Sequence, residues 1–134
     1  RWCAALLLLA PVLLAACGGA PQMKLRVSPA NDTNDRLPCY LVVRRVDPKA
    51  YVSDSYQSVA SMVMTPDDSV VTSALVFPGT TQDFTFSPPL KGQLAVYVLF
   101  TYPTGDWKTL LPTAMPSQLE IKLAASRLYP PAAR

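Results

Sequence analysis

Fourteen prolines are spread along this 134-residue chain, and they limit the length of any regular element that it can form. Proline costs about 3 kcal/mol inside a helix, whereas turns and strand edges accept it. The segments between turns alternate apolar and polar residues or are almost wholly apolar, which is typical of strands. The sequence lacks the regular alternation of strands and longer helices that an α/β fold would show. We therefore expect an all-β protein.

Six or seven strands are expected, separated by turns rich in Pro, Asn and Asp at intervals of roughly 8 to 12 residues. In the first, Met23, Leu25 and Val27 share one face, which predicts a half-buried strand. The second is apolar on both faces and is expected inside a sheet, with Cys39 as a small buried hydrophobe. The expected strands are residues 23–28, 39–46, 70–77, 81–86, 94–102, 106–111 and 118–128.

Two further segments complete the expected fold. Apolar residues at roughly helical spacing in residues 49–64 predict one short helical segment. Residues 130–134 are expected to form a loose C-terminal tail, and Trp107, after a Gly-Asp turn, is expected to be partly buried. Short strands of this number and spacing predict a β-sandwich or a β-barrel.

The most apolar run of the chain ends in Leu14-Ala15-Ala16-Cys17. This run follows Arg1, contains Pro11 and is shorter than the roughly 20 residues that cross a bilayer, so it favours a secretory signal over a membrane span. Its last four residues resemble the bacterial lipobox, in which the cysteine is acylated. Because two or more acyl chains anchor a protein stably, Cys17 is expected to hold the chain on a membrane. The alternative is a plain secretory signal after which Cys17 stays a thiol.

The predicted organisation is therefore a lipoprotein signal peptide at residues 1–16, a lipidated tether at 17–22, a folded domain at 23–129 and the tail at 130–134. Gly18-Gly19 lacks the aspartate associated with retention in the inner membrane. We accordingly expect the protein on the periplasmic face of the outer membrane. The lipid on Cys17 is the only attached group expected, and no cofactor is predicted.

The composition offers little for catalysis or metal binding. The chain has no histidine, which removes Ser-His-Asp and Cys-His relays and most zinc sites. Asp67 and Asp68 would point to opposite sides of an extended chain. The Asn- and Asp-rich residues 31–35 lack the glycine and the distal glutamate of a calcium loop. Because 12 basic residues face 9 acidic ones without a basic stripe, nucleic acid is not an expected partner. We expect no enzyme activity, catalytic residue, metal site or small-molecule substrate.

These features together resemble the TssJ family of type VI secretion lipoproteins. The family has a strand after the lipidated cysteine, a loop with Asn and Asp, and an Arg-Pro step into a strand with Val-Val-Arg. Further matching segments are the apolar-Pro-Gly step at Phe77-Pro78-Gly79, residues 94–102 followed by Trp107, and the closing strand at 119–128. In this chain the residues that match the family's Arg-Pro step and the strand with Val-Val-Arg are Arg36, Pro38, Val42, Val43, Arg44 and Val46.

The resemblance implies a transthyretin-like β-sandwich that binds the periplasmic domain of the inner-membrane protein TssM. In the family, the loop after the first strand carries much of this contact, which corresponds to residues 30–37 here. A polar loop on a rigid sandwich is a common place for binding residues. The same anchor and fold class also suit a pilotin, which escorts a secretin to the outer membrane, or a lipid-anchored hydrolase or carbohydrate-binding protein. The expected partner-binding residues are Asn31, Asp32, Thr33, Asn34, Asp35 and Arg36.

Overall fold

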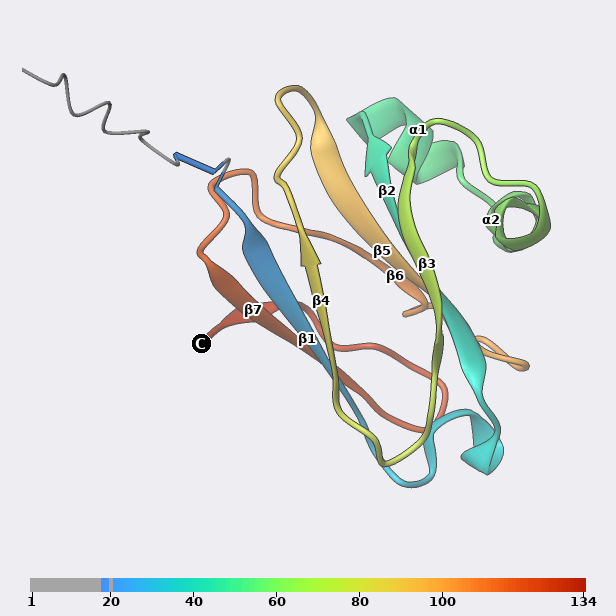
Figure 1. Cartoon of the computed structure of the whole chain (residues 1–134). Helices are drawn as coiled ribbons and strands as arrows, with labels where there is room; N and C mark the ends of the chain where they lie inside the picture. The colour runs from blue at the N-terminus through green and yellow to red at the C-terminus, as the bar shows by residue number, and fades with distance from the viewer. Residues whose placement is uncertain (1–17, 20) are drawn as a thin grey trace, which may run out of the picture.

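A computed structural model describes residues 18–19 and 21–134, which form two packed sheets of four strands each (Figure 1). One sheet has the strand order β4-β1-β7-β8 and the other the order β3-β2-β5-β6. The all-β sandwich predicted from the sequence is confirmed, whereas residues 1–16 and Cys17 lie outside the described residues. The strands are β1 (Met23–Pro29), β2 (Cys39–Val46), β3 (Val70–Val76), β4 (Gln82–Phe86), β5 (Gln93–Leu99), β6 (Lys108–Leu110), β7 (Gln118–Leu123) and β8 (Ala132–Ala133).

The main core lies between the two sheets and follows the predicted alternation. Met23, Leu25 and Val27 of β1 are buried and pack in this core, while the polar residues between them face outward. Alternate residues of the other long strands meet them from both sheets, including Cys39, Leu41 and Val43 of β2, Val96 and Val98 of β5, and Leu119 and Ile121 of β7. Each strand with alternating apolar and polar residues therefore buries its apolar face against the facing sheet.

A second apolar cluster covers the outer face of the β3-β2-β5-β6 sheet. Two helices, α1 (Pro48–Ser53) and α2 (Tyr56–Met64), pack there against residues such as Val42 and Tyr97 (Figure 1). This explains why β2 is apolar on both faces, as predicted for an interior strand. The expected helical segment is confirmed and consists of two helices. Each begins at a capping side chain, since Asp47 accepts the Ala50 N–H at 2.7 Å and Ser55 accepts the Ser58 N–H at 3.1 Å.

Two expectations about the end of the chain need correction. The last long strand ends at Leu123 instead of residue 128, because the chain turns and Leu128 bridges back to Leu123. The residues expected to form a loose tail then run beside β7, where Ala132 and Ala133 pair with it as β8. The open edge of β7 carries unpaired backbone N–H and C=O groups, to which a returning segment can form hydrogen bonds. Arg134 adds an ion pair, with its Nε 3.6 Å from Glu120 Oε2.

The sandwich has two distinct ends. The chain enters at Met23, and β1 carries it to the opposite end, where the loops 30–38, 77–81, 100–107 and 124–127 lie (Figure 1). We call this the loop end. The end beside Met23, called the tether end, carries α1 and the loops 87–92 and 111–117. In the part of the chain that the structure describes, no helix has the length and apolarity needed to span a membrane.

Candidate functional site

The loop between β1 and β2 is built into the loop end by backbone hydrogen bonds to two other loops. Its first residue, Ala30, donates its N–H to the carbonyl of Leu123 at 2.9 Å and accepts the N–H of Gly79 at 3.2 Å. Gly79 has a φ of +72°, and a Cβ at this position would lie 2.4 Å from Asn31 Oδ1. A Cβ here would displace the Asn31 side chain, and the positive φ would strain any residue other than glycine.

The centre of the loop, the short helical turn η1 (Thr33–Arg36), is left-handed. Asn34, Asp35 and Arg36 have φ values of 51°, 54° and 65°. Left-handed backbone costs an ordinary L-residue about 1–2 kcal/mol, and consecutive residues of this kind are rare outside glycine. Such a turn persists only where its surroundings hold it in place.

Asn34 supplies most of the contacts that hold the turn. Its Nδ2 donates to the carbonyls of Leu37 and Pro38, at 3.2 Å each, and its Oδ1 accepts the Thr101 N–H at 2.7 Å. Its backbone N–H donates to the carbonyl of Ala125 at 2.8 Å. One side chain therefore joins the β1–β2 loop to the β5–β6 loop, and its backbone reaches the loop after β7.

The six predicted site residues fall into two groups. Thr33 and Asn34 are 0% and 5% exposed, and Thr33 Oγ1 donates to the carbonyl of Leu123 at 3.3 Å. These two residues shape the loop and present little surface to a partner. The exposed residues are Asn31, Asp32, Asp35 and Arg36. They lie on the rim of the loop end, where a partner can reach them.

Apolar side chains that the sequence did not single out lie beside this rim. Tyr102 is 82% exposed and Leu37 is 54% exposed, and both line a small pocket together with Asp35 and Ser126. Large exposed apolar side chains next to polar ones are typical of protein-binding surfaces. Pro103 predicts a turn after Tyr102. The exposure of the Tyr102 side chain, however, depends on how three loops meet at the loop end.

A separate charged cluster lies beneath the helices. Arg44 Nη1 contacts both carboxylate oxygens of Asp54, at 2.8 and 2.9 Å, and both side chains are 10% exposed. Arg44 Nε donates to Ser69 Oγ at 3.0 Å, and Tyr97 donates its hydroxyl to Asp54. Burial and the bond to Asp54 raise the pKa of Tyr97, which keeps its hydroxyl protonated as a donor. These groups satisfy one another, so the cluster holds α1 to the sheet.

Aromatic side chains extend this cluster along β6. The Trp107 ring lies 5.4 Å from that of Tyr56 and 5.5 Å from that of Tyr97, and Trp107 packs against both apolar clusters. Its predicted partial burial is confirmed. Lys108 Nζ donates to the carbonyl of Tyr51 at 2.6 Å and lies 4.7 Å from that residue's ring centre. Across residues 18–19 and 21–134, no three acidic or cysteine side chains converge as a metal site would require.

Residues 40–123 match the protein family described as IglE, N-terminal domain. The chain belongs to this family. The matched residues run from β2 to the end of β7, so β1 and the whole β1–β2 loop lie before them. No curated protein is significantly similar in sequence to this IglE-family chain.

Solved structures show the same fold. The T6SS lipoprotein TssJ1 from Pseudomonas aeruginosa has 18% identity and a TM-score of 0.65, over 87% of this chain and 98% of that one. Serratia marcescens Lip, a membrane-bound component of the type VI secretion system, has 15% identity and a TM-score of 0.68, over 85% and 98%. A structure of the C-terminal domain of the T6SS protein TssM from EAEC contains a chain with 16% identity and a TM-score of 0.64, over 81% and 95%. The TssJ-like sandwich inferred from the sequence is thus confirmed as the fold of this chain.

Proposed function

We propose that this protein is an outer-membrane lipoprotein that forms a structural part of a type VI secretion membrane complex. In this proposal Cys17 carries the lipid, and the loop end binds the periplasmic domain of a TssM-type inner-membrane protein. Family membership and the shared fold with T6SS lipoproteins support the assignment to this system. Because one fold can serve several functions, the choice of partner depends on the site itself.

The observation that carries the proposal is the position of the candidate loop relative to the tether. Cys17 precedes β1 by a short tether, and the seven residues of β1 span about 20 Å before the loop begins. A lipid at Cys17 therefore places the loop end on the far side of the sandwich from the bilayer (Figure 1). A partner that approaches from the periplasm meets the β1–β2 loop first.

The character of the loop end fits a protein partner better than a small ligand. Arg36 and Asp35 provide charge on a loop that Asn34 holds in one conformation, and Leu37 and Tyr102 provide exposed apolar area. A loop held in one conformation loses little entropy when it binds. The contact would place a few aromatic and aliphatic side chains at the centre of a polar rim.

Capture of candidate periplasmic domains by the soluble form, residues 18–134, tests the partner. We expect a TssM-type domain to bind, and Tyr102→Ala and Leu37→Asp to weaken that binding. Thr113→Ala, an exposed change at the tether end, is the matched control and should bind as the wild type does. Capture of a secretin tail but no TssM-type domain would instead identify a pilotin.

Membrane fractionation tests the anchor. Cys17→Ser removes the acylated sulfur without touching the sandwich, so we expect a folded protein that no longer partitions into membranes. Retention of this variant in the outer-membrane fraction would show that something other than the lipid holds the protein there.

A further inference from the structure

Two loops at the tether end lie beside the start of β1 and form a continuous surface. Residues 87–92, with the sequence SPPLKG, join β4 to β5, and residues 111–117, with the sequence LPTAMPS, connect β6 to β7. They line a shared pocket that includes Pro89, Leu90, Pro112 and Met115. The Lys24 N–H donates to the carbonyl of Ser117 at 2.8 Å, which ties the second loop to β1. This surface therefore lies where the tether leaves the sandwich.

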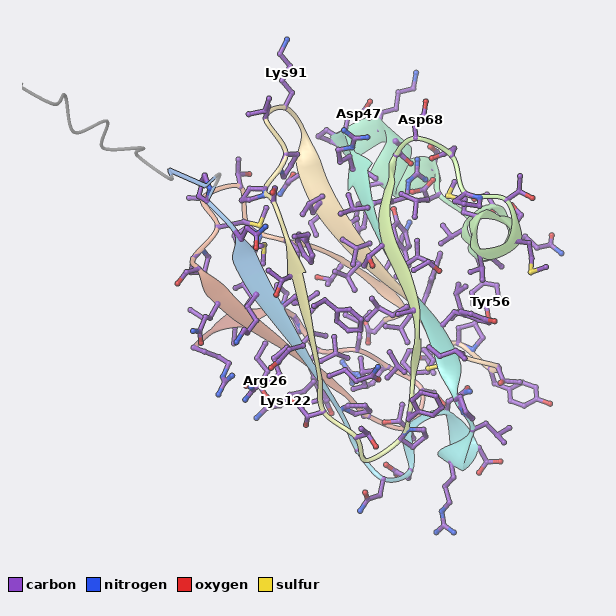
Figure 2. All side chains as sticks on the ribbon, viewed as in Figure 1. Arg26, Asp47, Tyr56, Asp68, Lys91 and Lys122 are labelled. Atoms are coloured by element: carbon purple, nitrogen blue, oxygen red, sulfur yellow. The ribbon has the colours of Figure 1, made fainter. Side chains whose placement is uncertain are left out.

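The tip of the first loop presents an unpacked apolar side chain. Leu90 is 103% exposed, as in an extended peptide, and Lys91 beside it points away from the molecule (Figure 2). Single exposed leucines are common, so exposure alone assigns no role. Pro88 and Pro89 restrict the backbone that leads into the tip. Gly92 follows with a φ of +79°, where an added Cβ would lie 3.1 Å from the carbonyl oxygen of Val46.

The charges of this surface distinguish it from the rest of the molecule. The two loops and the described tether residues 18–19 and 21–22 contain one cation, Lys91, and no carboxylate. A neighbouring pocket is lined by Lys91 together with Asp47, and the cations among its lining residues, Arg44, Arg45 and Lys91, outnumber that one carboxylate. An apolar tip beside an excess of cations is suited to phospholipid headgroups, which attract the cations while the acyl boundary accepts the leucine.

We propose that Leu90 and its flanking prolines enter the headgroup region of the bilayer that holds Cys17, forming a second membrane contact beside the lipid. This inference rests on the proposed anchor. Six residue steps separate Cys17 from Met23, so the tether spans at most about 20 Å. At that distance the bilayer is always within reach, and a contact too weak to hold a free protein becomes effective. The contact fixes the sandwich with its loop end directed away from the membrane.

Tryptophan fluorescence of the full mature protein on vesicles tests this contact. The probes are Leu90→Trp and, as the matched control at the loop end, Tyr102→Trp. The lipidated protein is placed in vesicles of phosphatidylethanolamine and phosphatidylglycerol, with or without lipids brominated near the glycerol end of the acyl chains. The emission of half-buried Trp107, measured in the parent protein, is subtracted. We expect the indole at position 90 to shift to shorter wavelength and to lose intensity with brominated lipid, and the indole at position 102 to do neither.

Equal quenching of the two probes, or quenching of neither, would overturn the bilayer contact. Circular dichroism and unfolding curves that match the parent protein show that both variants are folded, as expected for changes at exposed positions. The mass of the purified protein reports separately on the anchor. Acylated Cys17 with unquenched position 90 removes the contact and leaves the anchor standing, whereas an unmodified sulfur removes both. Binding of the TssM-type domain is measured on residues 18–134 in solution and depends on neither result.

Discussion

Replacement of Asn34 is the sharpest test of how the loop end is built. Asn34→Ala removes the acceptor of the Thr101 N–H and the donor to the carbonyls of Leu37 and Pro38. It also places alanine at a φ of 51° and a ψ of 40°, where a side chain that cannot bond its own backbone is strained. Asn34→Gly removes the same side-chain bonds but accepts this backbone without strain. The two variants therefore separate hydrogen bonding from conformation.

The expected losses follow from these contacts. Two to three hydrogen bonds at about 1 kcal/mol each give a loss of about 2–3 kcal/mol for Asn34→Gly. Left-handed strain adds about 1 kcal/mol for Asn34→Ala, so its total is about 3–4 kcal/mol. For a domain of this size, 1 kcal/mol lowers the melting temperature by about 4 °C, which predicts a fall of roughly 12 °C or more for the alanine variant.

Urea unfolding of residues 18–134 measures these differences. Asp32→Ala, an exposed change in the same loop, should stay within about 0.5 kcal/mol of the wild type. Both Asn34 variants should also bind the partner less well, because the loop is no longer held in one conformation. Losses below about 1 kcal/mol for both Asn34 variants would refute the idea that this side chain determines the loop.

Three further changes probe the outer cluster and the core. Asp54→Ala leaves the Arg44 guanidinium and the Tyr97 hydroxyl without their acceptor, so we expect urea unfolding to show a loss of about 3–5 kcal/mol, and a loss under about 1 kcal/mol would contradict this role. Trp107→Ala should lower stability by about 2–3 kcal/mol in calorimetry because the ring packs between two apolar clusters, and an unchanged melting temperature would argue against that packing. Burial raises the pKa of Cys39 from 9.0 to about 11. The stability that the buried, protonated thiol contributes is therefore complete below pH 9 and is lost as the pH rises towards 11. Over this range the free energy of unfolding should fall less in Cys39→Ala than in the wild type, and equal slopes would exclude the thiol as the cause.

The individual strands could be predicted because the faces of a sandwich strand differ. In β1 the buried residues Met23, Leu25 and Val27 alternate with outward polar ones, and in β2 both faces are apolar because helices cover the second one. The pairing of strands could not be read in the same way. β1 pairs in parallel with β7, with Leu25 opposite Leu119, and β8 joins the other edge of β7. Such contacts between distant segments leave no periodic signal in either segment.

The candidate site was predictable in position but not in detail. Clustered Asn and Asp residues predict the loop, but nothing in their pattern distinguishes one of residues 31–36 from another. In the structure Thr33 and Asn34 are buried and the other four are exposed. The difference arises because Asn34 bonds to Thr101, which lies 67 residues away along the chain. The exposure of Tyr102 could not be predicted either, because the apolar run around it predicts a strand that continues to residue 102. In the structure β5 ends at Leu99. The exposure of Tyr102 comes from the early end of that strand.

The place of β1 in the sandwich has a mechanical consequence. β1 joins the tether directly to the β1–β2 loop and is hydrogen-bonded along both sides, to β4 and to β7. In the proposed function, tension between the bilayer and a partner held at that loop would act along the axis of this strand. The covalent backbone of β1 then carries the tension from one end of the strand to the other, and neither ladder is opened bond by bond from an end. We expect the domain to withstand pulling in this direction better than pulling that peels β8 from its edge.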